Sequence, residues 1–438
     1  MTEEPLVGLE TEMFILNDKG SVVNKADVIL RNIKNTNNKK HITKECAKSM
    51  IEIGAFPHPY IHKTTKYLFD NMESALKIAE KNNLSLLPLG TYPGKTMPEM
   101  RNESIYKIKE KIFGKNRFLI AGRCSGFHCH YDLPFNLPLI KNISLLQFLD
   151  IKHETSMING YNMLIAIDPA LTTFMQSSPF YQGKNLGKDS RMIMYRGSKC
   201  LKNPSALYSQ YPEFGHLPGY KHSMFEVLDM VDEKFDDWKN CIKSVGLNIK
   251  ALSMYGSLLS TSWNPVKINQ LGTLEQRGMD MNHPQQIVSA SALVKYVTKR
   301  IYEEELDVVP SDIAIKEPFK VENDKLYIPP DRYVYKNLQR ASAYQGMDNK
   351  KIWNYCKCLL NFAKKAIPKE NRSHILTFQN MLDEKKTMSD EILKSARKKG
   401  WRKNSILTQK TAEEISLNHA DRLAKEIISA KKQLEKLG

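Results

Sequence analysis

Alternating hydrophobic and polar positions predict that the segment VGLETEMFIL, residues 7–16, is a β-strand. Successive side chains of a strand point to opposite faces. One face of this strand therefore carries Gly8, Glu10 and Glu12, and the other face carries the apolar residues Val7, Leu9, Met13 and Ile15. The two carboxylates lie about 7 Å apart along the strand. In a partly buried setting the repulsion between the two carboxylates must be offset by water, a basic side chain or a bound cation close by.

The same alternation recurs in three later segments. SMIEIG places Glu52 between two isoleucines, SGFHCHYD places His128 and His130 on one face, and TLEQRG places Glu275 and Arg277 on one face. An antiparallel sheet with one solvated face has this pattern too. However, these polar positions hold carboxylates and imidazoles, which are ligands for divalent cations. If the four strands share a sheet, the polar face predicts a site for Mg²⁺ or Mn²⁺.

Helical spacing of apolar residues predicts two helices in the body of the chain. One follows Thr64 and Thr65, and the other begins at Pro284. Short strands and amphipathic helices alternate through residue 305. The pattern indicates an α+β protein without internal repeats.

The last part of the chain has a different composition. Prolines mark residues 305–350 as irregular, and the residues beyond them are mostly helical and basic. The final helix is expected to begin with a capping box formed by Thr411 and Glu414. We therefore divide the chain into residues 1–310 and residues 311–438. The second region is expected to pack on the first.

Composition narrows the class of protein. The chain has 438 residues, 41% of them hydrophobic, which is enough for one large or two medium globular domains. We expect no membrane partner, because no apolar run has the length of a membrane span. The chain has seven cysteines without CxxC pairs, which favours a reduced, cytoplasmic protein. Glu3 and Glu4 stand where a signal peptide would have basic residues, and this also favours the cytoplasm.

The net charge of +17 favours anionic partners such as nucleotides or phosphorylated intermediates. A generally lysine-rich composition explains the same number equally well. The densest basic run, RKKGWRK at residues 397–403, contains one tryptophan. A single aromatic residue among basic ones is a weak signal for nucleic acid. Nucleic acid is therefore not an expected partner.

The motifs in chain order resemble those of a known superfamily. GLETEMFIL resembles the G-x-E-x-E first catalytic strand of the glutamine synthetase superfamily, SGFHCHYD its S-G-x-H-x-H strand, and GTLEQRGMD its E-x-R strand. SSPFYQGKNLGKDSR is similar to the S-S-P-F-x-x-G…S-x-R segment of the glutamate–cysteine ligase and carboxylate–amine ligase family. The resemblance covers residues 6–305.

The resemblance implies a glutamine synthetase-like α+β fold, in which a curved antiparallel sheet forms a half-barrel with helices on its convex side. It also implies an ATP-dependent ligase that forms an amide through an acyl phosphate. The default substrates are the γ-carboxylate of glutamate and the amine of cysteine. By motif position, Glu10, His128 and Glu275 would hold one Mg²⁺, Glu12 and Glu52 another, His130 and Arg277 would contact ATP, and Arg191 and Arg196 the amino acid or the phosphoryl group.

Two alternatives stay open on the sequence. The ligase could join the carboxylate to another amine, or the chain could be a catalytically silent regulatory or nucleic-acid-binding relative. The sequence leaves undetermined the amine acceptor, whether the carboxylate donor is glutamate, the oligomeric state and the role of the basic C-terminal region.

Overall fold

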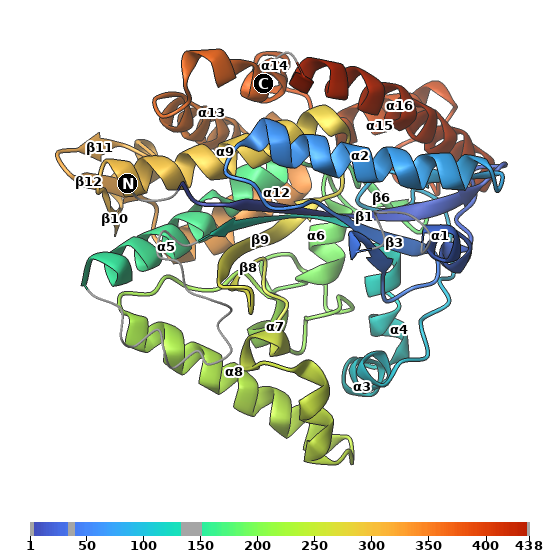
Figure 1. The fold of residues 1–438 in the computed structure, drawn as a ribbon, viewed down its shortest axis with the longest axis horizontal. Helices are drawn as coiled ribbons and strands as arrows, with labels where there is room; N and C mark the ends of the chain where they lie inside the picture. Colours follow the sequence, from blue (N-terminus) through green and yellow to red (C-terminus); the bar gives the residue numbers. More distant parts are fainter. Residues whose placement is uncertain (1–3, 34–39, 133–150, 436–438) are drawn as a thin grey trace.

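The computed structural model describes residues 4–33, 40–132 and 151–435 of the chain (Figure 1). Within these residues, seven strands form an open antiparallel sheet in the order β2-β3-β1-β5-β9-β8, and β4 also pairs with β1. The strands are β1 (Val7–Asn17), β2 (Ile42–Lys44), β3 (Met50–Gly54), β4 (Leu84–Leu87), β5 (Gly126–Asp132), β8 (Val266–Ile268) and β9 (Thr273–Asp280). This sheet, with the helices packed on it, confirms the predicted α+β class.

The register of the sheet brings the four polar strand faces together. Glu12 of β1 lies opposite Glu52 of β3, and Glu10 lies opposite His128 of β5. On the other side of β5, His130 lies opposite Glu275 of β9. The four segments predicted as strands are therefore neighbours, and their polar side chains share one face of the sheet.

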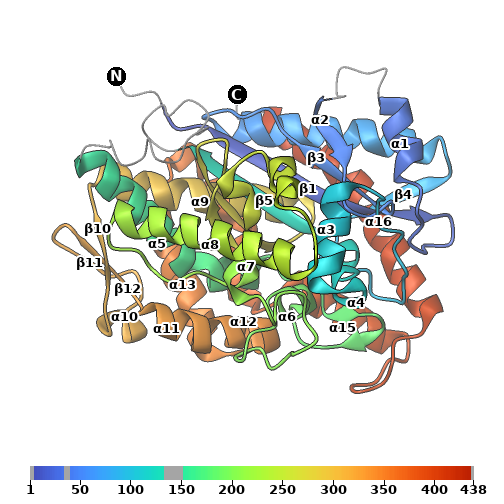
Figure 2. The ribbon, with the colours of Figure 1, turned by 90° about the horizontal axis from the view of Figure 1, so that it is seen from below.

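Three long helices cover the apolar face of the sheet: α2 (Ile61–Glu80), α5 (Ile151–Phe174) and α9 (Pro284–Glu303). The apolar strand residues are buried with helix residues in one core. Figure 1 shows α2 and α9 on one side of the sheet, and α3 (Ser104–Phe113), α4 (Lys115–Phe118), α7 (Pro212–Gly215) and α8 (Met224–Ser244) on the other. The polar face of the sheet thus points toward this second set of helices. Figure 2 shows these helices from below.

The two predicted body helices exist, and one begins earlier than expected. α9 begins at Pro284 as predicted. α2 begins at Ile61, before Thr64 and Thr65. The Thr65 hydroxyl donates to the Ile61 carbonyl at 2.6 Å, and the Thr64 hydroxyl donates to His58 at 3.1 Å. Both threonines therefore lie inside the first turn of the helix, donate to carbonyls that precede them, and do not cap the helix.

The C-terminal helices α15 (Met388–Lys398) and α16 (Gln409–Glu435) pack on the main sheet and its helices. Phe14 and Leu16, at the end of β1, are buried in a second core with residues of both helices, such as Ile392 and Ile415. α16 also contacts α2 and β4. The C-terminal region therefore packs on the main body, while the division at residue 310 stays a prediction.

The predicted capping box of the last helix is wrong. α16 begins at Gln409, and the Thr408 hydroxyl accepts a hydrogen bond from the Thr411 amide at 3.2 Å. Glu414 instead forms an ion pair with Lys399. Thr408 lies three residues before Thr411, and that spacing places it at the cap position.

The region 305–350 is more regular than its prolines predict. Strands β10 (Asp307–Pro310), β11 (Val321–Glu322) and β12 (Lys325–Ile328) form a small sheet, and α12 (Gln339–Gln345) follows it. Pro310 ends an edge strand, where a missing amide donor costs nothing. The remaining elements that bear on the packing are α1 (Ala26–Ile33), β6 (Phe180–Tyr181), β7 (Lys184–Asn185), α6 (Ser190–Tyr195), α10 (Ile313–Lys316), α11 (Asp331–Tyr333), α13 (Lys350–Lys364) and α14 (Leu376–Glu384).

Candidate functional site

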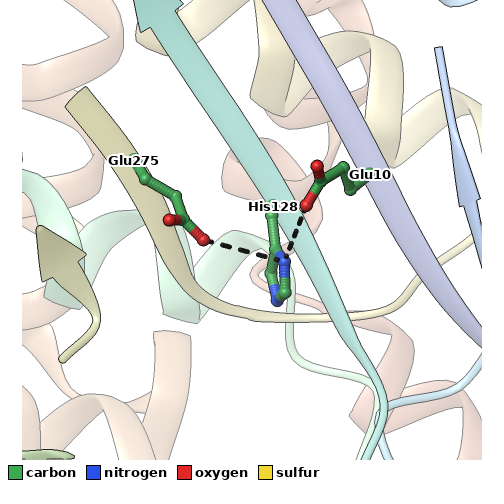
Figure 3. Close-up of side chains that lie close together, drawn as sticks. All are labelled: Glu10, His128 and Glu275. Atoms are coloured by element: carbon green, nitrogen blue, oxygen red, sulfur yellow. Dashed lines mark ion pairs between the residues drawn. The ribbon is translucent and has the colours of Figure 1, made fainter. Parts of the chain in front are cut away.

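Three side chains from three neighbouring strands converge on the polar face of the sheet. Figure 3 shows Glu10 of β1, His128 of β5 and Glu275 of β9 pointing toward one another. His128 Nδ1 is 3.5 Å from Glu10 Oε2 and 3.9 Å from Glu275 Oε1. One candidate ligand atom of each residue lies within 4.8 Å of the others. The register of the sheet therefore places two carboxylates and an imidazole around one point.

The charges at this point influence one another strongly. Burial alone would raise the pKa of Glu10, but the adjacent His128 and His130 outweigh it and hold that pKa far below its usual range. Burial likewise opposes ionisation of Glu275, yet Arg277 and His130 lower its pKa to about 2. Both carboxylates are therefore ionised at neutral pH and present negative charge to the centre of the cluster.

The residues present fit a hard divalent cation. His128 Nε2 and His130 Nε2 are buried without a hydrogen bond to any described residue, although Glu12 lies 3.7 Å from the first and Glu10 lies 3.4 Å from the second. A buried polar atom without a hydrogen bond is costly unless it binds something. Carboxylate oxygens suit Mg²⁺, and a mixed oxygen and imidazole set also suits Mn²⁺. Glu10, His128 and Glu275 could thus hold one such ion.

A second group of carboxylates lies beside the first. Glu12 Oε1 is 3.7 Å from His128 Nε2, and Glu12 Oε2 accepts a hydrogen bond from the Gly126 amide at 2.6 Å. Glu52 accepts from the Thr43 hydroxyl at 3.1 Å. Burial, together with the carboxylates of Glu45 and Glu10, raises the pKa of Glu52 well above its usual range. Such mutual repulsion would be relieved by a second cation.

Glu45 belongs to this second group, although the sequence did not indicate it. It lines the same cavity as Glu12 and Glu52, and burial followed by the charge of Glu12 raises its pKa. Glu45 follows the last residue of β2 and lies outside any alternating pattern. The pairing of β2 with β3 brings Glu45 near the strand that carries Glu52, and this pairing leaves no local signal in the sequence.

The carboxylates line a cavity of about 300 Å³. Its remaining wall comes from α3, α4, α6 and the loops around residues 207 and 263. Arg277 Nη1 is 3.4 Å from Glu275 Oε1, so its guanidinium lies beside the candidate metal site. Four aromatic residues also line the cavity: Tyr106, Tyr195, Tyr208 and Trp263. The cavity thus combines charged side chains with aromatic ones, as ligand sites commonly do.

Arg191 reaches this cavity from α6. The Asp189 carboxylate accepts from the Met192 amide at 2.7 Å and so caps the helix that carries Arg191. The Arg191 guanidinium donates to the Gly278 carbonyl at 3.2 Å and lies over the Tyr195 ring, 5.1 Å from its centre. Its Nε atom is buried and has no hydrogen-bond partner among the described residues. Arg191 is therefore held rigidly and retains a free donor.

Arg196 is placed differently. It is buried and forms a bidentate pair with Asp168 of α5, at 2.6 and 2.9 Å, and it also donates to Gln339 at 2.6 Å. Both terminal nitrogens are thus bonded within the protein. A substrate role for Arg196 stays a prediction, and this pairing weighs against it.

Lys267 is a further charged residue that the strand patterns did not single out. It lies opposite Glu275 in the sheet, and its ammonium donates to the Leu259 and Ser262 carbonyls at 2.7 and 3.0 Å. Burial lowers its pKa to about 8. The sequence signal is its position in β8, a strand too short for its alternation to stand out.

A second cavity, of about 350 Å³, adjoins the cluster on the side of His130. Glu10 and Glu52 line both cavities, whereas His130 lines only this one. The His130 ring bonds to the Thr273 hydroxyl at 3.0 Å. Leu6, Leu9, Ala55, Pro57 and Leu271 make much of the remaining wall apolar. The carboxylate cluster therefore lies between an aromatic cavity that holds both acidic and basic side chains and a more apolar cavity.

No described helix is long and apolar enough to cross a membrane.

Comparisons with known proteins agree with this fold. Similar solved structures include glutamate–cysteine ligase from Francisella tularensis in complex with AMP, with 14% sequence identity and a TM-score of 0.63. That match covers 99% of this chain and 93% of the other. A bifunctional glutathione synthetase from Pasteurella multocida shares 12% identity at a TM-score of 0.59, and the match covers 97% of this chain and 54% of that one. Identities this low show a shared fold only.

No curated protein sequence matches the chain. The sequence model of glutamate-cysteine ligase family 2, in contrast, matches residues 6–330. That range includes every strand of the main sheet and all the residues of the two carboxylate groups. The chain belongs to glutamate-cysteine ligase family 2.

Proposed function

We propose that this protein is an ATP-dependent carboxylate–amine ligase that activates the γ-carboxylate of glutamate as an acyl phosphate and transfers the acyl group to an amine, with cysteine as the first candidate. The observation that carries the proposal is the convergence of Glu10, His128 and Glu275 beside Arg277 in one cavity. Family membership supports the ligase class. Glutamate and cysteine are the substrates that the family name suggests.

The residues divide into roles by their positions. Glu10, His128 and Glu275 would hold one divalent cation, and Glu12 and Glu52 a second, with Glu45 beside them. When bound, such ions neutralise phosphate oxygens and favour in-line phosphoryl transfer. Arg277 adds a fixed positive charge beside Glu275, and Arg191 offers its free Nε atom from α6, close to the backbone of Arg277.

The chemistry requires charge neutralisation more than covalent help from the protein. A carboxylate oxygen of glutamate attacks the γ-phosphorus of ATP, and ADP leaves. The resulting acyl phosphate has a good leaving group, so the amine nitrogen attacks its carbonyl carbon and inorganic phosphate departs. Arg191 and Arg277 are placed to stabilise negative charge on the transferred phosphoryl group. No side chain has to act as a nucleophile.

The two cavities suggest where the substrates lie. The apolar cavity beside His130 suits the base and sugar of ATP, because apolar walls bind a planar base. Its phosphates would then reach the carboxylate cluster that both cavities share. The cavity that holds Arg191 and Arg277 suits the glutamate and the acceptor amine. In this arrangement the phosphoryl group crosses from one cavity to the other at the metal-binding residues.

A substrate panel tests the proposal. Purified protein with Mg²⁺, ATP and glutamate is given one amine at a time, phosphate release is followed, and products are weighed by mass spectrometry. We expect phosphate release that depends on one amine, together with an amide of the matching mass. If ATP binds but no pair of substrates gives phosphate or amide, the proposed function is wrong.

A further inference from the structure

A third cavity is distinct from the two cavities of the candidate site. It measures about 470 Å³ and shares no lining residue with either of them. Its wall comes from three parts of the chain: the segment from β7 to α6, the segment that joins α12 to α13, and α15 with the residues after it. The basic run RKKGWRK at residues 397–403, which the proposed function leaves unexplained, supplies Arg397, Trp401 and Lys403 to this wall.

The end of α15 turns the basic run back on itself. Gly400 has a left-handed φ of +89°. Its amide donates to the Arg397 carbonyl, and the Trp401 amide donates to the Ala396 carbonyl, both at 3.0 Å. This pair of bonds is a Schellman motif, which favours glycine because glycine has no Cβ. The reversal brings Arg397, on the helix, and Lys403, beyond it, to the same cavity.

Trp401 anchors this run to the β6–β7 hairpin. Its ring is buried and meets Phe180 edge-on, with 5.0 Å between the ring centres. Its indole N–H donates to the Ser405 carbonyl at 2.9 Å. A ring that is packed inside the protein does not serve as a stacking platform for nucleic-acid bases. The packing of Trp401 therefore disfavours nucleic acid as the partner of the run.

The third cavity carries more positive charge than its own anions balance. Asp348 is the one carboxylate that the described residues contribute to its wall, and it pairs with Lys188 at 2.9 Å. Three further cations line the cavity, and all three are exposed: Lys350, Arg397 and Lys403. Their side chains form no ion pair or hydrogen bond with any residue that the structure describes. Like charges that share a cavity without an anion are stabilised by an anionic ligand.

The positions of these cations indicate the kind of anion. Lys350 is the first residue of α13, whereas Arg397 and Lys403 belong to α15 and the turn after it. A ligand that meets the cations of both elements needs at least two anionic groups. The Asn349 side chain already accepts from the first amides of α13, so side chains and not helix amides supply the donors. The volume lies within the range of sites for small molecules.

The same cavity adjoins the segment that positions Arg191. Lys188 lines the cavity, and Asp189, the next residue, caps the helix that carries Arg191. The Lys188 and Asp189 amides donate to the Ala343 carbonyl of α12, at 2.8 and 3.0 Å. The Lys188 carbonyl accepts from the Ser389 hydroxyl of α15. The segment before Arg191 is therefore held between two elements that also form the wall of the cavity.

We propose that the third cavity is an effector site for a small molecule with two or more anionic groups, such as an organic bisphosphate or a polycarboxylate, and that its occupation steadies the segment before Arg191. The binding is independent of the proposed ligase function, whereas the effect on turnover rests on it. A bound anion offsets the repulsion among the three cations and draws α13 and α15 together. Because Arg191 faces the cavity proposed for glutamate, the anion should lower the KM of glutamate.

Calorimetric titration of the whole protein, without Mg²⁺ or nucleotide, tests the binding. The probes are fructose 1,6-bisphosphate and citrate, which distinguish the two kinds of ligand, and inorganic phosphate, which has a single anionic group. We expect one of the first two to bind more tightly than phosphate does. Arg397→Gln and Lys403→Gln should each weaken binding of that probe about fivefold or more, because an ionic contact is lost.

Lys398→Gln is the matched control. It makes the same change within the basic run, at an exposed residue outside the cavity wall, and should bind the probe as wild type does. Thermal unfolding establishes that each variant is folded. Phosphate release with the productive amine, at constant free Mg²⁺, then measures the effect on turnover. The probe should lower the KM of glutamate about fivefold in wild type and in Lys398→Gln, but not in Arg397→Gln.

The possible failures are distinguishable. If neither organic anion binds the wild type, or if binding is as tight in Arg397→Gln and Lys403→Gln, the cavity is not an anion site and the inference is wrong. Binding at the cavity without a change in the KM of glutamate, in an active ligase, would overturn the link to Arg191. Binding at the cavity by a protein that forms no amide would support the site and refute the proposed function. Displacement of the probe by a single-stranded RNA oligonucleotide, with weaker RNA binding in the same two variants, would overturn the inference and assign these cations to nucleic acid.

Discussion

Glu10 of β1 lies directly opposite His128 of β5, and 3.5 Å separate Glu10 Oε2 from His128 Nδ1. The next strand adds Glu275 to the same point. Opposite residues of antiparallel strands have neighbouring side chains, so this grouping follows from the register of the sheet and not from a flexible loop. A cation bound here would be held by three strands that cannot move independently.

The first prediction concerns Glu275. Glu275→Gln keeps the shape of the side chain but removes the charge beside Arg277 and His128. We expect turnover to fall about a hundredfold or more, since charge stabilisation of phosphoryl transfer is lost. Steady-state phosphate release measures this, and calorimetric titration with Mn²⁺ should show weaker binding.

The matched control for Glu275 is Glu80→Gln, the same change at an exposed position at the end of α2. This variant should retain wild-type turnover and Mn²⁺ affinity. Wild-type turnover of a folded Glu275→Gln protein would remove Glu275 from the metal-binding residues.

Much of the cluster could be predicted from the sequence, because strand alternation fixes which side chains share a face. Glu10, His128 and Glu275 each stand in such a pattern, and antiparallel pairing of β1, β5 and β9 then makes them neighbours. The resemblance to a family supplied the chain order of the motifs. Alternation alone could not supply the order of the strands in the sheet.

Other cavity residues could not be predicted, because each enters from an element without a local signal. Glu45 follows a strand of three residues, and Lys109 is one of several lysines on α3. The pairing of Arg196 with Asp168 depends on a carboxylate buried inside α5. An ion pair between residues far apart in the chain has no periodic trace in the sequence, so the prediction for Arg196, which came from its motif position, could not take this pair into account.

The second prediction concerns that ion pair. Asp168 accepts from Arg196 and also from Gln276 at 3.0 Å, and all three side chains are buried. Asp168→Asn should lower the free energy of unfolding by about 3 kcal/mol or more, because the Arg196 charge is left buried and uncompensated. Urea unfolding at neutral pH measures the loss. Stability equal to wild type would mean that the pair does not anchor α6 to α5.

The third prediction concerns stability in acid. Burial lowers the pKa of His374 to about 4, with His62 and Lys295 adding to the effect, and neither ring nitrogen has a hydrogen-bond partner among the described residues. Below pH 6.5 the unfolded chain takes up a proton at this histidine and the folded chain does not. The folded state therefore loses stability as the pH falls toward 4.

Replacing this histidine should remove its share of the acid sensitivity. Between pH 7 and pH 4.5, His374→Leu should lose about 2 kcal/mol less stability than the wild type does. Urea unfolding at the two pH values gives the difference for each protein, so a change in overall stability cancels. Equal losses in the two proteins would show that His374 is not held neutral in the fold.

The central claim is that the carboxylate is activated by phosphorylation, and transfer of an oxygen isotope tests it most directly. Glutamate labelled with ¹⁸O in its γ-carboxylate is incubated with the protein, Mg²⁺, ATP and the productive amine, and the phosphate and nucleotide are analysed by mass spectrometry. Our account predicts one ¹⁸O atom in the inorganic phosphate for each amide formed and none in the nucleotide. Amide formation with unlabelled phosphate, or with the label in AMP, would contradict an acyl-phosphate mechanism.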